Sequence, residues 1–102
     1  MSDAHVIRES GGTITVTPGV LSQVVVGAAE SVDGVRVRRP RRGVEVDVEG
    51  GRARVALELA VRYGHVLPEA AGEVQRRVHG ALRDMCGVDA SVVDVSVEEL
   101  DA

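Results

Sequence analysis

Residues 44–63 read VEVDVEGGRARVALELAVRY, and this stretch decides the fold because it predicts a β-hairpin together with its register. Apolar and polar residues alternate on both sides of Gly50 and Gly51, and two consecutive glycines suit a two-residue hairpin turn. The apolar side chains then fall on one face, which is typical of a sheet with one buried side. The predicted pairs are 48 with 53, 46 with 55, 44 with 57, 47 with 54 and 49 with 52.

The polar side chains of this predicted hairpin oppose one another in pairs of opposite charge. Asp47 faces Arg54, and Glu49 faces Arg52. Cross-strand pairs of this kind contribute about 0.2–1 kcal/mol each. The alternation and the cross-strand chemistry therefore agree on one hairpin.

Two amphipathic helices are predicted on either side of the hairpin in the sequence. The first has Thr17 as a possible N-cap, Pro18 at its first position and Gly34 as its stop, with one apolar face at positions 21, 24, 25, 28, 29 and 32. The second begins at Pro68 and ends at Gly87. Its predicted inward residues are Leu67, Ala71, Val74, Val78, Ala81, Leu82 and Met85.

Two glycines inside the second predicted helix call for a packing explanation. Gly72 and Gly80 each cost a helix about 1 kcal/mol relative to alanine. We therefore expect close packing against a neighbour at both positions.

Short alternating runs at 13–16 and 93–97 complete the predicted elements. The expected fold is α+β, a two-layer sandwich with the order β-α-β-β-α-β and both helices on one face of a mainly antiparallel sheet. The 102 residues form one domain with no linker or repeat, and the stretches 1–11 and 99–102 are candidate flexible ends.

The composition restricts both the core and the location. Valine supplies 22 positions, Phe and Trp are absent, and Tyr63 is the single aromatic residue, so we expect a core of small aliphatic side chains. The single Cys86 cannot form an internal disulfide, which fits a reducing compartment. The N-terminal stretch does not resemble a signal peptide, and no apolar run approaches the roughly 20 residues that span a bilayer. These features favour a soluble, cytoplasmic protein.

Charge is distributed unevenly along the chain. The net charge is −4, yet residues 36–42 hold five of the twelve arginines and no acid. From Asp89 onward the chain carries five acids and no base. A basic loop is thus predicted on an acidic body with an acidic tail.

Two clusters could suggest catalysis or metal binding, and both are poor candidates. His65, Glu69 and Glu73 are spaced by four, but His65 precedes the helix start at Pro68, and the set lacks the paired histidines of helix-borne zinc sites. His79 and Cys86 lie seven residues apart on one helix, over about 10 Å along its axis. We expect no enzyme activity, no metal and no cofactor.

Two charged surfaces remain as candidate interaction sites. One is the arginine loop, with Arg36, Arg38, Arg39, Arg41 and Arg42. The other is the polar face of the second helix, with Glu69, Glu73, Arg76, Arg77 and Arg83. Each could be merely solvated or could bind a protein partner, and a helix face of mixed charge is usually only solvated.

The arginine loop has two further candidate ligands, anionic lipid and nucleic acid. Nucleic acid is the weaker of these, because single-strand binders stack bases on exposed aromatic side chains. The predicted outward residues of the long strand supply none; they are Arg54, Ala56, Glu58, Ala60 and Arg62.

Four segments carry a resemblance to a known family, and they cover nearly the whole chain. They read GGTITVTPGVLSQVVVGAAESVDGV, VEVDVEGGRARVALELAVRYG, LPEAAGEVQRRVHGALRDMCGV and VVDVSV. The most specific feature is the order of short motifs: Gly34-Val35, Tyr63-Gly64, Pro68-Glu69, Glu73-Val74-Gln75 and Met85 to Val88. The chain in these respects resembles the alkaline shock protein family of bacterial envelope-stress proteins.

The resemblance implies a non-enzymatic protein that self-associates and is held at the cytoplasmic face of the membrane by an integral membrane protein. We expect a scaffold or adaptor in which the arginine loop of one copy meets the acidic tail or body of another, or meets anionic lipid. Such a head-to-tail contact would build rings or filaments and weaken with salt. The alternative is a small nucleic-acid-binding module that uses residues Arg36 to Arg42.

Overall fold

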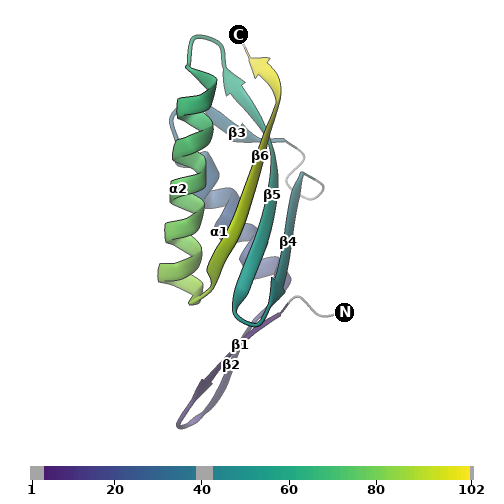
Figure 1. Cartoon of the computed structure of the whole chain (residues 1–102), viewed down its shortest axis with the longest axis vertical. Helices are drawn as coiled ribbons and strands as arrows, with labels where there is room; N and C mark the ends of the chain where they lie inside the picture. Colours follow the sequence, from purple (N-terminus) through teal and green to yellow (C-terminus); the bar gives the residue numbers. More distant parts are fainter. Residues whose placement is uncertain (1–3, 39–42, 102) are drawn as a thin grey trace.

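The computed structural model describes residues 4–38 and 43–101 and confirms a two-layer α+β architecture. Both helices lie against one side of the main sheet (Figure 1). The elements are β1 (His5–Glu9), β2 (Gly12–Val16), α1 (Pro18–Glu30), β3 (Val35–Val37), β4 (Val44–Glu49), β5 (Arg52–Arg62), α2 (Leu67–Cys86) and β6 (Asp89–Asp101).

Strand β5 is the centre of the main sheet. Both β3 and β4 pair with it antiparallel on one side, β4 along its first half and β3 near its end. Strand β6 pairs with β5 in parallel on the other side, and α2 supplies the crossover that a parallel pair requires. Two of these three pairings are antiparallel, which confirms the predicted sheet.

The predicted register of the central hairpin is confirmed at every pair from Glu49 opposite Arg52 to Val44 opposite Leu57. Gly50 and Gly51 both have positive φ, at 60° and 80°, so the turn needs residues without a side chain. Asp47 lies opposite Arg54 as predicted, but the described residues show no ion pair between them.

The predicted strand at 13–16 exists as β2, but it lies outside the main sheet. It pairs with β1, which we did not predict, and the two strands form a separate hairpin that projects from one end of the molecule (Figure 1). Residues 5–9 and 99–101, which lie within the candidate flexible ends, are in strands.

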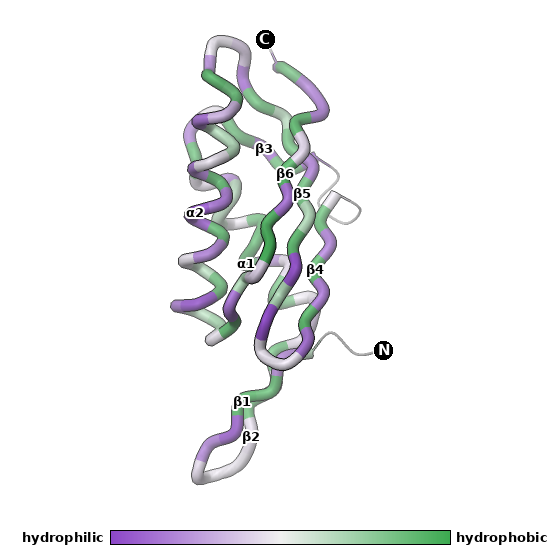
Figure 2. The backbone as a smooth tube through the Cα atoms, viewed as in Figure 1, coloured by the Kyte–Doolittle hydropathy of each residue, from purple (hydrophilic) through white to green (hydrophobic). Residues whose placement is uncertain are grey.

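The core between the sheet and the helices consists of aliphatic side chains, as the composition predicted. Apolar and polar residues alternate along β4 (Figure 2), and along β5 buried positions alternate with more exposed ones as far as Leu59. From α1 the core takes Leu21, Val25 and Ala29. Helix α1 ends at Glu30, four residues before Gly34, where we had placed its stop.

The buried stripe of α2 differs from the predicted one at several positions. It repeats every four residues, and its members are Ala70, Val74, Val78, Leu82 and Cys86. Met85 is 72% exposed, so its predicted inward position is wrong, and Ala71 and Ala81 are only half-buried. Met85 and Cys86 are both apolar, so their types do not show which of the two side chains is buried. Tertiary packing buries Cys86.

The predicted close packing at Gly80 is also wrong. A Cβ at Gly80 would meet nothing within 4 Å, and one at Gly72 would meet only Nη1 of Arg76 at 3.6 Å. Both glycines therefore weaken α2 without a packing reason within the described residues.

Candidate interaction surfaces

The first two arginines of the predicted loop lie on the open face of the sheet. Alternation along β3 buries Val35 and Val37 against the helices and directs Arg36 to the opposite face. There Nη2 of Arg36 lies 2.9 Å from Oδ2 of Asp101, and Nε of Arg38 lies 3.1 Å from Oε1 of Glu99. The basic segment and the acidic tail therefore meet within one chain.

These two ion pairs pass over the central strand at Ala60. In the register, Ala60 lies between Arg36 on β3 and Glu99 on β6. Its side chain belongs to the open face, as predicted, yet it is 0% exposed, with Arg36 on one side of it and Glu99 on the other. A small side chain at this position leaves room for the arginines to reach across.

The contact with Asp101 changes the acid–base behaviour of Arg36. The hydrogen bond from Arg36 to Asp101, followed by the attraction of the same carboxylate, raises the pKa of the Arg36 guanidinium. Arg36 and Arg38 are thus already engaged with carboxylates. Arg39, Arg41 and Arg42 lie outside the described residues.

The second candidate surface is organised around Glu73 on α2. Its carboxylate accepts hydrogen bonds from Arg77 at 2.9 Å and from Arg76 at 2.7 Å, and these two contacts lower the pKa of Glu73. Arg77 also donates to the backbone carbonyl of Ser31, 2.9 Å away. This chain of contacts ties α2 to the residue that follows α1.

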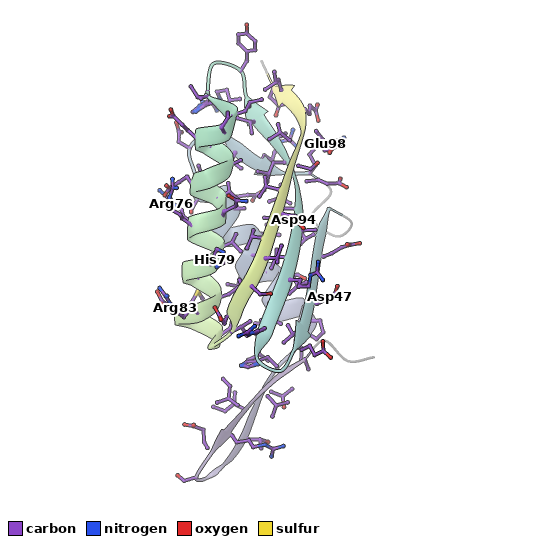
Figure 3. The ribbon with its side chains drawn as sticks, viewed as in Figure 1. Asp47, Arg76, His79, Arg83, Asp94 and Glu98 are labelled. Atoms are coloured by element: carbon purple, nitrogen blue, oxygen red, sulfur yellow. The ribbon has the colours of Figure 1, made fainter. Side chains whose placement is uncertain are left out.

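The remaining predicted residues of the α2 face are more weakly held. Nε of Arg83 lies 3.6 Å from the neighbouring Asp84, and among the described residues Glu69 makes no ion pair. Figure 3 shows Arg76 and Arg83 projecting from the side of α2 that faces away from the sheet. The structure therefore brings the α2 residues together on one surface and places Arg36 and Arg38 on another.

A groove of about 740 Å³ runs between the end of α1 and the first half of α2. Its apolar lining includes Val66, Pro68 and Ala70, and its charged lining includes Glu73 and Arg76. The sequence does not predict this groove, because the groove depends on how the two helices pack.

His65 has a different role from the metal ligand that its spacing first suggested. Its ring packs on the backbone of Gly34, and Nε2 lies 3.9 Å from Oδ2 of Asp33. The described part of the chain contains no group of three His, Cys, Asp or Glu residues arranged to hold a metal ion.

Cys86 lies in the core and is 3% exposed. Burial raises the pKa of its thiol, which is the opposite of the change that activates a cysteine nucleophile. The environment of Cys86 is that of a packing residue.

Three exposed apolar side chains gather at one end of the main sheet, and one of them is Tyr63, which was expected on the buried face of the hairpin. They are Tyr63, Val66 and Leu100. The amide of Tyr63 donates to the carbonyl of Asp101 at 2.6 Å, which places the end of β5 beside the end of β6. The sequence shows that these residues are apolar. Their exposure depends on the parallel pairing of β5 and β6, which no local pattern predicts.

The fold and these surfaces define a small two-layer α+β domain whose charged residues form ion pairs on opposite faces of the molecule. The model of the alkaline shock protein 23 family, described as having a cell envelope-related function, matches residues 36–102. The chain belongs to this family, which confirms the resemblance seen in the sequence.

Solved structures share the fold. The MamM CTD spanning its residues 215–293 is 24% identical, with a TM-score of 0.63 over 79% of this chain and 96% of that chain. A copper form of a MamM CTD variant is also 24% identical, with a TM-score of 0.63 over 79% of this chain and 95% of that chain. No curated protein matches the chain. Within residues 4–38 and 43–101, no helix has the length and apolar character to cross a membrane.

Proposed function

We propose that the protein is a non-enzymatic scaffold or adaptor in the homeostasis of the bacterial cell envelope. In this role it associates with itself and is held at the cytoplasmic face of the membrane by an integral membrane protein. The observation that carries the proposal is the family match over residues 36–102, with its cell envelope-related function. Self-association and membrane attachment are the further steps that the proposal adds.

The groove beside α2 is the part of the described surface best suited to a protein partner. Its apolar lining at Val66, Pro68 and Ala70 can bury a side chain of the partner, and the charged residues Glu73 and Arg76 can fix its orientation. Because Glu73 already holds Arg76 and Arg77, this part of the surface is ordered before binding. We assign the groove to a short segment of the membrane protein.

The nucleic-acid alternative gains no support from the described arginines. Arg36 and Arg38 bind the carboxylates of Asp101 and Glu99, so a phosphate would have to displace an existing partner. The same contacts compete with the head-to-tail pairing in which Arg36 and Arg38 would meet the acidic tail of another copy.

Attachment through a protein is tested by co-sedimentation of the purified chain with native membranes. We expect sedimentation with intact membranes, loss of sedimentation after protease treatment of the membrane surface, and no sedimentation with vesicles of anionic lipid. Sedimentation with pure lipid vesicles would overturn attachment through a protein and favour direct lipid contact.

A matched pair of variants tests the assignment of the groove. The double variant Arg76→Glu and Arg77→Glu reverses two charges of α2 that line the groove, and the control Arg52→Glu and Arg54→Glu reverses two on β5. Only the α2 variant should lose binding to native membranes. Equal binding by both variants would mean that the partner does not bind at α2.

A further inference from the structure

The β1–β2 hairpin is the least supported part of the molecule. It projects beyond the end of the main sheet, and neither helix covers it (Figures 1 and 2). With the hairpin included, the molecule measures 50 × 22 × 17 Å. Over the described residues, the two strands of the hairpin pair with each other and with no third strand. A two-stranded hairpin is only marginally stable in water, whereas three or more strands with an apolar face are stable.

The two free edges of this hairpin differ in chemistry. Strand β2 reads GTITV and carries no charge, no proline and no bulge, and four of its five residues are β-branched. Strand β1 ends with Arg8 and Glu9. Charged residues, proline and bulges are the usual protection of an exposed edge, so the edge of β2 is open to strand pairing.

The register shows which backbone groups this edge offers. Glu9 and Gly12 close a two-residue turn, and hydrogen-bonded pairs alternate with non-bonded pairs from there. The backbone N–H and C=O of Thr13 and Thr15 are therefore directed away from β1, towards the free edge. Ile14 lies between them, opposite Ile7, and is 52% exposed.

We propose that β2 of one copy pairs antiparallel with β2 of a second copy, across a twofold axis at Ile14. The two hairpins would then form one four-stranded sheet. Thr13 would face Thr15 of the second copy, and each of these pairs would exchange two backbone hydrogen bonds. The two Ile14 side chains would meet on the face that already carries Ile7.

A second copy fits this edge on charge and on geometry. The strand is neutral, so pairing it with itself opposes no like charges, and Thr–Thr and Ile–Ile are favourable cross-strand pairs. The hairpin projects from the body, so the edge of β2 lies beyond the end of the main sheet (Figure 1). Strands of five residues bury less than about 1,200 Å² in total, so we expect a weak dimer with a Kd in the micromolar range.

This contact deepens the proposed function, because it specifies which surface mediates self-association. Its biological meaning rests on the proposed scaffold role. It is isologous, and therefore differs from the head-to-tail contact expected from the charge pattern.

Cross-linking at the twofold axis tests the register. Residues in a non-hydrogen-bonded antiparallel pair have Cα atoms about 4.5 Å apart, within disulfide range. In a Cys86→Ala background, we expect Ile14→Cys to form a disulfide-linked dimer under mild oxidation. The control Val6→Cys, at an exposed position on β1, should remain monomeric on denaturing gels. Cross-linking through Val6→Cys alone would overturn the assignment to β2.

Sedimentation equilibrium of the full chain tests whether the edge carries the dimer. Thr15→Pro removes an N–H directed to the free edge of β2, and proline is tolerated at such edge positions. Val6→Pro makes the same change at the free edge of β1. We expect Thr15→Pro to raise the Kd at least about tenfold, or about 1.4 kcal/mol, and Val6→Pro to leave it within about twofold.

The outcomes separate this contact from the proposed scaffold role. An oligomer unchanged by Thr15→Pro and not cross-linked through Ile14→Cys would overturn the β2 contact while leaving self-association through another surface. A wild-type chain that stays monomeric at every concentration would overturn both the contact and the self-association in the proposed function. Binding to native membranes would be unaffected by either result.

Discussion

At the scale of single residues, the contact between Gly34 and His65 shows how one glycine joins two loops. Gly34 has φ of 79°, and an added Cβ would lie 2.4 Å from Nε2 of His65. The ring of His65 can pack on Gly34 in this position because Gly34 has no side chain. Gly34, from the motif Gly34-Val35, thus contacts His65, which follows the motif Tyr63-Gly64.

Gly34→Ala is expected to destabilise the fold by about 1–3 kcal/mol, because it combines a strained positive φ with displacement of the His65 ring. Gly64→Ala is the control, since Gly64 has φ of 105° and nothing within 4 Å of an added Cβ. In urea unfolding, Gly34→Ala should cost more than Gly64→Ala, and His65→Ala should remove that excess. Equal costs for the two glycines would mean that the His65 contact contributes nothing.

Gly80→Ala should have the opposite sign. Gly80 lies inside α2 with open space around an added Cβ, so alanine should stabilise the protein by about 0.5–1 kcal/mol through helix propensity. Gly87→Ala, at the left-handed C-cap of the same helix with φ of 67°, should destabilise it. Thermal melting measures both, and a loss of stability in Gly80→Ala would indicate that another molecule packs there.

At the scale of elements, the register of the β4–β5 hairpin could be predicted and the partner of the acidic tail could not. The hairpin depends on a period of two and a Gly50-Gly51 turn, both of which are local. The partner of β6 depends on a parallel crossover, so the sequence showed Glu99 and Asp101 as an acidic tail without revealing that they bind β3 of the same chain.

In the interaction surfaces, too, contacts within one element could be predicted and contacts between elements could not. Glu73 and Arg77 are four residues apart, a spacing that favours an ion pair on a helix, and the structure has this contact at 2.9 Å. The link from Arg77 to Ser31 and the groove beside it join separate elements. No local spacing encodes such contacts. The charged residues could therefore be identified from the sequence, but the surface that they form together could not.

Glu73 should make the stability of the α1–α2 layer depend on pH. Its pKa is lower in the folded chain because Arg77 and Arg76 favour the carboxylate, so its stabilisation is present above the unfolded pKa of about 4.3 and is lost as pH falls through the folded value. Glu73→Gln should lower the urea midpoint at pH 7 and have a smaller effect near pH 3. Glu69→Gln, which removes a carboxylate one turn earlier, is the control, and an equal effect of Glu73→Gln at both pH values would contradict the prediction.

At the scale of the whole molecule, two kinds of self-association predict opposite responses to salt. A head-to-tail contact between arginines and acids weakens as salt rises, whereas pairing of neutral β2 edges does not depend on attraction between opposite charges. The two kinds also differ in form, since a head-to-tail contact continues to a ring or filament and an isologous contact stops at two copies.

Raising salt from about 0.01 M to about 1 M shortens the Debye length from about 30 Å to about 3 Å, which is enough to separate these contacts. With the β2 contact, we expect the dimer to keep its Kd within about threefold across this range in sedimentation equilibrium, and the mass to stop at two copies. The net charge of −4 gives each copy a weak mutual repulsion, so any change should be a slight strengthening at high salt. Larger species at low salt that dissolve at high salt would instead assign assembly to the arginine segment and the acidic residues, and Arg36→Gln with Arg38→Gln would then reduce it.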